Sequence, residues 1–331
     1  MKGQEMRFSL SAAAMTAVAG FFLTLPSWAL DCPSLRLLPG LRADRIQAEG
    51  LVRAGKPRSG ESRRDRLRGL FSRPAAGEMV IVSVGSSSRP VRLDEQGAFC
   101  CEFPRPAGTD TIELSVAEPA GGMLLRKLEQ QLPATSALLI VSDIDDTVLV
   151  SKVTTKLKLI YNSLLRRAGS RRPVPGTAEI YRGIHDAAGS SGLFVYLSAS
   201  PAAMERFIDG FLSRNGFPGG LLITGDGLSS SPEKTTAHKT AWLNRLAELF
   251  SDVPMLLIGD SGEQDPEIYT AFAVSGSARV TGIIIRGIAP LDEKRENAIR
   301  SRLAKTGTPF LLWKEPDELR AGLASLGFRI P

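Results

Sequence analysis

Three carboxylates crowd into the short segment Asp143-Ile144-Asp145-Asp146-Thr147. They directly follow residues 136–142, a mostly apolar run with β-branched members that is typical of a buried strand in a parallel sheet. The carboxyl ends of such strands border the binding crevice of α/β folds. Because neighbouring negative charges repel one another, we expect a bound divalent cation to offset them. An Asp-rich turn or helix cap is the alternative interpretation of the same residues.

A second acidic group follows another apolar run. Residues 255–259 lead into Asp260, and Asp265 follows in the same loop. If this run and the one before Asp143 are neighbouring parallel strands, then Asp143, Asp145 and Asp260 converge at one edge of the sheet. An oxygen-only cluster of this kind suits Mg²⁺. The chain has only 2 histidines, which argues against a zinc centre built from imidazoles.

Two further polar residues stand beside predicted elements. Ser198 ends the apolar run 193–197, and Pro201 fits the first turn of a helix, so backbone N–H groups near Ser198 would point at an anion. A serine before a helix is more often only a cap. Lys239 lies at the start of a helix with apolar periodicity, where a lysine is ordinarily solvated.

The order of these residues resembles that of the haloacid dehalogenase-like phosphatases. In that order Asp-x-Asp-x-Thr follows one strand, Ser follows the next, Lys stands at a helix, and Gly-Asp-x-x-x-x-Asp follows a later strand. Within the superfamily, the sequence is similar to the phosphatidate phosphatase catalytic domain of the actin-patch protein type, over about residues 136–290. The motifs that carry the similarity are Ser142-Asp143-Ile144-Asp145-Asp146-Thr147, Arg172-Pro173-Val174-Pro175-Gly176, Leu197-Ser198-Ala199-Ser200-Pro201, His238-Lys239 and Gly259-Asp260-Ser261-Gly262-Glu263-Gln264-Asp265-Pro266-Glu267-Ile268-Tyr269.

The resemblance implies a role for each residue of the first acidic segment. Asp143 would be the nucleophile that attacks phosphorus and forms an aspartyl-phosphate. Asp145 would act as general acid towards the leaving alcohol and then as general base for the hydrolytic water. Thr147 would hold Asp145 or its loop in place. Asp146 would have a structural or supporting role.

The resemblance also implies which residues bind phosphate and metal. Ser198 would hydrogen-bond a non-bridging phosphoryl oxygen, and Lys239 would neutralise charge on the nucleophile and on the transferring phosphoryl group. The Mg²⁺ ion would be held by Asp143, the backbone carbonyl of Asp145 and Asp260, with Asp265 acting through water or orienting the site.

Between the first two motifs, residues 148–192 form an insert, and inserts at this point form caps over the active site in the superfamily. The insert contains leucines and isoleucines together with a basic set: Lys152, Lys156, Lys158, Arg166, Arg167, Arg171 and Arg172. A basic, amphipathic cap suits a lipid phosphate lying in a membrane surface. Alternatively, the apolar stripe belongs to the core and the charges are a solvated face.

These features predict a Mg²⁺-dependent phosphatase that converts phosphatidate to diacylglycerol and phosphate. The expected partners are an anionic phospholipid or another phosphomonoester as substrate, with peripheral contact to a membrane surface and no nucleic acid. The net charge of +6 favours anionic partners in general without separating their classes. The alternatives are an exported phosphatase for small soluble phosphomonoesters and a catalytically inert cell-envelope binding module on a phosphatase scaffold.

Residues 1–29 are predicted to be a signal peptide. A basic start precedes the apolar stretch 8–25, and Ser27-Trp28-Ala29 fits a cleavage site. An uncleaved membrane anchor is the alternative. The expected location is therefore the periplasm or the exterior, an oxidising compartment in which Cys32 could pair with Cys100 or Cys101.

The elements that must position the acidic segments alternate along residues 136–331. The predicted strands are 138–142, 193–197, 221–223, 255–259, 280–285 and 310–312. Helical patterns lie between them at 177–190, 201–215, 236–250 and 266–274. This alternation predicts an α/β fold with a doubly wound, Rossmann-like (HAD-like) parallel sheet and a short cap insert.

Two different segments precede this predicted catalytic domain. Residues 30–77 are predicted to be a basic Gly/Pro/Arg-rich arm or linker, which could alternatively lie on an anionic membrane surface. Residues 78–135 contain short apolar runs separated by turn residues, which predicts a small antiparallel β domain. Within it, residues 123–132 fit either a last strand or a helix.

Overall fold

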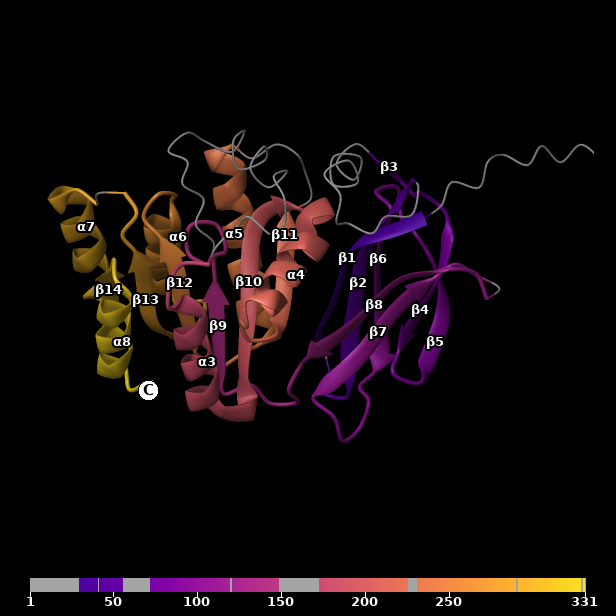
Figure 1. Cartoon of the computed structure of the whole chain (residues 1–331), viewed down its shortest axis with the longest axis horizontal. Coiled ribbons are helices and arrows are strands. Elements are labelled where there is room, and N and C mark those ends of the chain that lie inside the picture. The colour runs from indigo at the N-terminus through magenta and orange to yellow at the C-terminus, as the bar shows by residue number, and fades with distance from the viewer. Residues whose placement is uncertain are drawn as a thin grey trace, which may run out of the picture.

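The computed structural model describes residues 30–40, 42–55, 72–119, 121–148, 173–225, 231–289, 291–328 and 330. The described chain forms a β sandwich that lies beside a parallel sheet covered by helices (Figure 1). The predicted signal peptide, the middle of the predicted arm and most of the predicted cap insert lie outside the described residues. Among the described helices, none combines the length and apolar character needed to cross a bilayer.

The sandwich consists of two antiparallel four-stranded sheets. One contains β1 (Leu30–Pro39), β2 (Arg45–Ala54), β3 (Arg73–Pro74) and β6 (Ala98–Pro104), with β6 paired to β2. The other runs β5-β4-β7-β8 and contains β4 (Met79–Val84), β5 (Ser87–Arg92), β7 (Thr111–Ala117) and β8 (Leu124–Gln131). Alternate residues of β4 and β7 are buried, as expected of strands with one face in a core. The segment that fitted either a strand or a helix is therefore strand β8.

Residues 30–54 do not form the arm or linker that the sequence predicts for 30–77. They form the β1–β2 hairpin, which is paired throughout most of its length. β1 is buried along almost its whole length because it contacts β8 within the sandwich and α4 and β11 of the parallel part. A strand covered on both faces does not alternate between apolar and polar residues. Its buried polar residues Asp31, Ser34 and Arg36 also interrupt the apolar run, so the sequence pattern does not predict a strand here.

The cysteines do not form the disulfide that export led us to expect. All three, Cys32, Cys100 and Cys101, carry free thiols. The Cys32 thiol donates to the carbonyl of Ser34 at 3.2 Å. Cys100 and Cys101 are adjacent residues of β6, so their side chains point to opposite faces of the sheet.

The second part of the chain is a six-stranded parallel sheet of order β11-β10-β9-β12-β13-β14. Its strands are β9 (Leu138–Ser142), β10 (Gly192–Pro201), β11 (Gly220–Gly225), β12 (Met255–Asp260), β13 (Val280–Arg286) and β14 (Phe310–Trp313). β9 lies near the middle of the sheet with β10 on one side and β12 on the other, as Figure 1 shows. The predicted α/β fold with a parallel sheet is confirmed.

Helices cover both faces of this sheet. α3 (Thr177–Ala188), α4 (Glu205–Arg214) and α8 (Pro316–Ser325) pack on one face, and α5 (Pro232–Leu249), α6 (Asp265–Ser275) and α7 (Glu293–Leu303) pack on the other. Two short 3₁₀ helices, Gly189–Ser191 and Ala202–Met204, flank β10. Successive residues of the strands alternate between the two cores, which explains why each strand is an unbroken apolar run.

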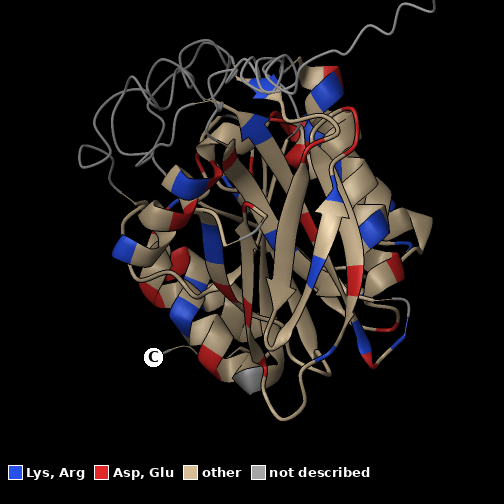
Figure 2. Ribbon diagram, turned by 90° about the vertical axis from the view of Figure 1, so that its right-hand side faces the viewer, with Lys and Arg blue, Asp and Glu red and all other residues tan. Residues whose placement is uncertain are grey.

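Basic and acidic side chains are interspersed over the described surface. Figure 2 shows Lys and Arg next to Asp and Glu on the same helices and strands, rather than separated by sign. Much of the basic composition of the arm and of the insert belongs to residues outside the described ranges. The charge of the described part therefore identifies no particular class of partner.

Candidate active site

The two acidic segments lie at the carboxyl ends of neighbouring strands. β9 and β12 are paired in parallel with Ser142 opposite Ile258, and the Asp143 N–H donates to the Ile258 carbonyl at 2.8 Å. Asp260 is the last residue of β12. The Ser142 hydroxyl donates to the Asp143 carbonyl at 2.7 Å and lies 2.8 Å from the Tyr181 hydroxyl. The pairing on which the predicted convergence depended is therefore present.

Lys239 reaches this edge of the sheet from helix α5. The helix begins at Pro232, and the side chain of Ser231 caps it by accepting from the Lys234 N–H. Thr235, Lys239 and Leu243 are four residues apart and form its buried face. Lys239 is only 1% exposed, so it is not the solvated lysine that its position would ordinarily suggest.

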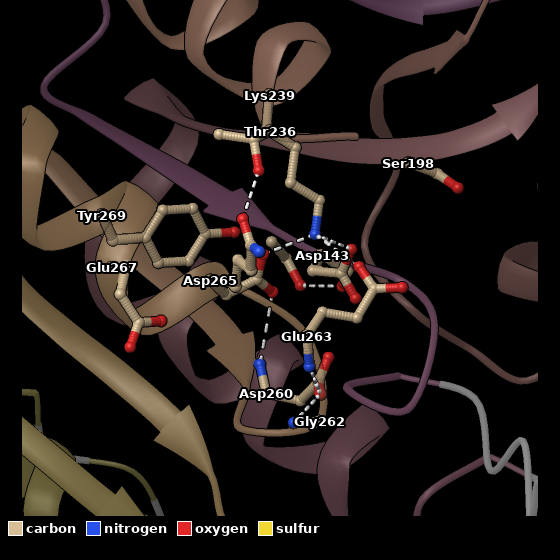
Figure 3. A network of polar contacts seen from close by, with 12 residues as sticks. Asp143, Ser198, Thr236, Lys239, Asp260, Gly262, Glu263, Asp265, Glu267 and Tyr269 are labelled. Carbon is tan, nitrogen blue, oxygen red and sulfur yellow. Dashed lines mark hydrogen bonds and ion pairs between the residues drawn. The ribbon is translucent and has the colours of Figure 1, made fainter. Parts of the chain in front are cut away.

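The Lys239 ammonium joins three acidic side chains, as Figure 3 shows. Its Nζ lies 2.8 Å from Asp143 Oδ1, 2.5 Å from Asp265 Oδ1 and 3.5 Å from Glu263 Oε2. We call Asp143, Lys239, Asp260, Glu263 and Asp265 the site cluster. It brings together Asp143 directly after β9, Lys239 of α5 and the segment from Asp260 at the end of β12 to Asp265 at the start of α6.

Asp265 and Asp260 are held by backbone donors. Asp265 is the first residue of α6, where the helix dipole favours an anion. Its Oδ2 accepts from the Asp260 N–H at 3.4 Å, so both of its oxygens have protein donors. Asp260 Oδ1 accepts from the N–H groups of Gly262 at 2.6 Å and Glu263 at 3.3 Å. These contacts fix the loop between β12 and α6 around the cluster.

The site cluster fits a divalent cation. Asp143 Oδ2 and Asp260 Oδ2 are buried and accept no hydrogen bond from any described residue. A buried carboxylate oxygen without a donor is costly, and four carboxylates share a single ammonium group. The ligand atoms of Asp143, Glu263 and Asp265 also lie within 4.8 Å of one another. The cluster therefore offers buried oxygen ligands and an excess of negative charge.

Burial shifts the acid–base equilibria of the cluster. It raises the pKa of Asp143 well above the ordinary 3.8, and the Lys239 ammonium opposes that shift. Burial together with the Asp265 carboxylate raises the pKa of Asp260 to about 8. Burial alone would lower the pKa of Lys239, but the carboxylates of Asp143 and Asp265 outweigh it and hold that pKa well above 10.5. The lysine thus stays charged, and the acids need a further positive charge to ionise fully.

The remaining predicted site residues, Asp145, Ser198 and Thr147, are not members of the site cluster. Asp145 is half-buried, and the Ser200 hydroxyl lies 3.4 Å from its Oδ2. The Ser198 hydroxyl accepts from the Ser200 N–H at 3.0 Å and points away from the site cluster in Figure 3. Thr147 is fully buried, and its hydroxyl makes no hydrogen bond to a described residue. The structure therefore brings Asp143, Lys239, Asp260 and Asp265 together but leaves the hydroxyls of Ser198 and Thr147 out of the cluster.

Sequence reasoning did not single out three residues that touch this site. Glu263 belongs to the site cluster, Ser200 approaches Asp145, and the Arg286 guanidinium donates to the Asp146 carbonyl at 2.6 Å. Glu263 and Ser200 belong to two of the motifs that carry the family resemblance, and this position could have identified them as candidate site residues. Arg286 ends a strand that the sequence only identified as buried, and nothing in its local pattern marks it.

Comparison with known proteins supports the resemblance stated from the motifs. Residues 138–287 match the family model of the phosphatidate phosphatase APP1 catalytic domain. The phosphatidate phosphatase APP1 of Saccharomyces cerevisiae is 26% identical over 150 residues, which are 44% of this chain and 25% of the yeast protein. The chain thus spans about a quarter of the length of that relative. The predicted resemblance to the actin-patch type of phosphatidate phosphatase is confirmed for this region.

Solved structures are only remotely similar. The carbohydrate acetylesterase XAC1771 of Xanthomonas citri is 11% identical, with a TM-score of 0.37 over 88% of this chain and 74% of that chain. A sialyltransferase from Photobacterium damsela is 10% identical, with a TM-score of 0.27 over 78% of this chain and 57% of that one. Likenesses at this level say nothing about the activity of this chain.

Proposed function

We propose that this chain is a Mg²⁺-dependent, HAD-like phosphatase that hydrolyses a phosphomonoester through an aspartyl-phosphate, with phosphatidate as its substrate and diacylglycerol and phosphate as products. The match of residues 138–287 to a phosphatidate phosphatase catalytic domain supports the reaction class. The observation that carries the proposal is the contact of 2.8 Å between Lys239 Nζ and Asp143 Oδ1, with Asp143 Oδ2 left free of any described donor.

That contact suits nucleophilic attack. The ammonium fixes one oxygen of Asp143 and leaves the other to attack phosphorus, forming a carboxyl–phosphate bond as the bond to the leaving oxygen breaks. Lys239 also places a fixed positive charge where negative charge gathers on the transferring phosphoryl group. Because the lysine is itself held by Asp265, its position does not depend on the substrate.

Asp145 would move the proton. It would protonate the leaving alkoxide in the first step and take a proton from the hydrolytic water in the second, when that water cleaves the acyl phosphate. Its half-buried side chain is consistent with both a substrate-facing position and a contact with Ser200. The hydrogen bond from Ser200 would orient the carboxyl group.

Mg²⁺ would be held by Asp143, Asp260 and the backbone carbonyl of Asp145, with Asp265 acting through water or by orienting the site. The ion would supply positive charge that ionises the buried acids and offsets the charge of the phosphoryl oxygens. The free oxygens of Asp143 and Asp260 are the observation that supports this assignment.

A lipid substrate is supported by the family match and by the basic, amphipathic sequence of the insert. Most of that insert lies outside the described residues, and we propose that it makes peripheral contact with an anionic membrane surface. We also propose export, from the signal-peptide pattern of residues 1–29, which N-terminal sequencing of the mature chain would test.

The deciding experiment traps the intermediate. The full chain with Mg²⁺ is mixed with phosphatidate in anionic micelles, quenched in acid within milliseconds to seconds, and searched for phosphate on Asp143 by mass spectrometry. We expect phosphate on Asp143 in the wild type and no phosphate at this position in Asp143→Asn. Asp146→Asn is the control: it makes the same change from carboxylate to amide three residues away, and its level of phosphorylated Asp143 should equal that of the wild type. Hydrolysis without any phosphate on Asp143 would contradict the assignment of Asp143 as the nucleophile.

Two further arms of the experiment address substrate and metal. Phosphate release from phosphatidate should exceed that from soluble esters such as glycerol phosphate at equal concentration, and EDTA should abolish both. A preference for soluble esters would replace the lipid by a small phosphomonoester. No EDTA-sensitive hydrolysis of any ester would favour the inert binding module.

A further inference from the structure

Asp146 adopts a left-handed backbone conformation, which is uncommon in non-glycine residues, although aspartate adopts it more readily than most. Its φ is 55°, and Asp146 and Asp252 are the non-glycine residues with positive φ among the described residues. A non-glycine residue in this left-handed region costs roughly 1 kcal/mol and persists only where surrounding contacts hold it. Here the chain turns immediately after Asp145, at the end of the segment that carries both proposed catalytic carboxylates.

Arg286 makes a contact that stabilises this turn. This residue ends β13 and is paired in register with Asp260 of β12 on one side and with Trp313 of β14 on the other. Its side chain extends towards the loop that follows β9, where its Nη1 donates to the carbonyl of Asp146 at 2.6 Å. The guanidinium therefore links the loop after β9 to a strand two positions away in the sheet.

Arg286 is itself held rigidly. Its guanidinium carbon lies 5.9 Å from the centre of the Trp313 ring, and Trp313 is only 1% exposed. Its backbone carbonyl accepts from the N–H groups of Ser261 at 2.9 Å and Ile288 at 3.1 Å. Both the guanidinium and the backbone of Arg286 therefore have defined contacts. A flexible side chain that only neutralised nearby charge would not need them.

We propose that Arg286 is a positioning residue for the phosphatase reaction, which holds Asp146 in its left-handed turn and thereby aims Asp143 and Asp145 at the phosphoryl group. The inference rests on the proposed function. It assigns Arg286 no contact with the substrate, since its observed partner is the backbone of the catalytic loop. Small displacements of reacting groups reduce the turnover rate strongly, whereas they affect substrate binding less.

The first test compares Arg286→Met and Arg286→Lys in the full chain, with p-nitrophenyl phosphate and Mg²⁺. We expect Arg286→Met to lower kcat by about 10- to 100-fold with KM changed less than about threefold. Arg286→Lys should recover part of kcat because an ammonium can still donate to the Asp146 carbonyl. Arg300→Met is the matched control, because Arg300 also donates to a backbone carbonyl, that of Phe310 at 3.1 Å, and lies 5.1 Å from the Phe310 ring. Phe310 is at the opposite end of β14 from Trp313, so the kcat of this variant should match wild type.

The second test uses Asp146→Gly, since glycine adopts positive φ without strain. In this background Arg286→Met should lower kcat by only about threefold, because the turn no longer needs to be held. The equilibrium constant for urea unfolding gives a readout that does not depend on activity. Arg286→Met should raise it by about 10-fold in the wild-type background and by about twofold beside Asp146→Gly.

The outcomes separate this inference from the proposed function. An active wild type with an equally active Arg286→Met overturns the inference alone. Equal losses of kcat with and without Asp146→Gly show that Arg286 does not act through the turn, which also overturns it. A wild type that hydrolyses no phosphomonoester overturns the proposed function and, with it, the positioning role.

Discussion

Two clusters of buried charge in this protein differ in their charge balance and in how completely their carboxylate oxygens are paired. The site cluster combines four carboxylates with one ammonium group and leaves two carboxylate oxygens without donors. The second cluster lies where the sandwich meets α4 and β11, and we call its members Asp31, Arg126, Glu205 and Arg206 the junction cluster. There two acids face two arginines, so the charges balance.

Glu205 illustrates the difference. Its Oε1 accepts from the Leu35 N–H at 3.0 Å and from Arg126 at 2.9 Å, and its Oε2 accepts from the Thr224 hydroxyl at 3.2 Å. The side chain is 1% exposed and both oxygens are satisfied. Arg206 similarly reaches Asp31 at 3.0 Å. A cluster with balanced charges and paired carboxylate oxygens joins two parts of a fold, whereas an acidic cluster with unpaired carboxylate oxygens can bind a cation.

The largest expected effect is on the activity of the site cluster. Asp143→Asn should lower phosphomonoester hydrolysis by at least about 10³-fold, because removing one member of a catalytic unit disables the unit. It should also raise the melting temperature in EDTA, since it removes a buried, poorly compensated carboxylate. Steady-state kinetics and calorimetric melting measure the two quantities. If Asp143→Asn were inactive and also strongly destabilised, the site cluster would contribute to stability as the junction cluster does, and the comparison between them would be wrong.

The junction cluster should respond in the opposite way. Glu205→Gln leaves Arg126 buried without its charge partner and should cost about 3–5 kcal/mol of unfolding free energy. The activity of each folded molecule should stay at the wild-type level, because Glu205 contacts Leu35, Arg126 and Thr224 and no member of the site cluster. Urea denaturation checks the first expectation and active-site-normalised kcat the second. Glu113→Gln, which breaks the exposed pair with Lys127, is the control and should leave the stability unchanged.

Metal binding to the site cluster should depend on pH. The pKa of Asp260 is raised to about 8 in the folded chain from an ordinary 3.8, so the folded, metal-free protein keeps this proton up to about pH 8. This stabilising term is complete below the ordinary pKa and is lost as the pH rises through about 8. Because Mg²⁺ needs the carboxylate, its affinity should rise by about 10-fold per pH unit between pH 6 and 8.

Titration calorimetry with Mg²⁺ alone, in two buffers of different ionisation enthalpy, measures both the affinity and the proton released. In Asp260→Asn the release should disappear, and metal-free stability should become less dependent on pH. An affinity that does not change with pH in the wild type would show that Asp260 is already ionised.

The smallest effect is expected at the edge of the site cluster. The Glu263 side chain is 32% exposed, and its contact with Lys239 is the longest of the three at 3.5 Å. Solvent screens such a contact, so Glu263→Gln should lower kcat by less than about 10-fold. A loss as large as that of Asp143→Asn, measured under the same conditions, would instead identify Glu263 as an essential ligand.

Much of the parallel part could be predicted from the sequence because its strands are buried on both faces. Residues 138–142 and 255–259 are continuous apolar runs that end in acids, and both became strands β9 and β12 with only small changes in their bounds. The β sandwich was harder to predict from the sequence. β1 is covered on both faces and yet contains Asp31, Ser34 and Arg36. Asp31 pairs with Arg206 of α4 and Arg36 with Glu49 of β2, contacts that the local sequence does not show, while the Ser34 hydroxyl accepts from Arg36.

The sequence by itself determined which residues the proposed function assigns to the chemistry and in what order they follow along the chain. Asp143, Asp260 and Asp265 stand at element ends that local periodicity identifies, because hydrophobic burial places those ends at one edge of a parallel sheet. Only the tertiary structure decided which of them touch. Lys239 reaches Asp143 across 96 positions of chain, and Arg286 reaches the loop after Asp145 across two strands, since a contact between distant segments depends on strand order and side-chain direction rather than on local pattern.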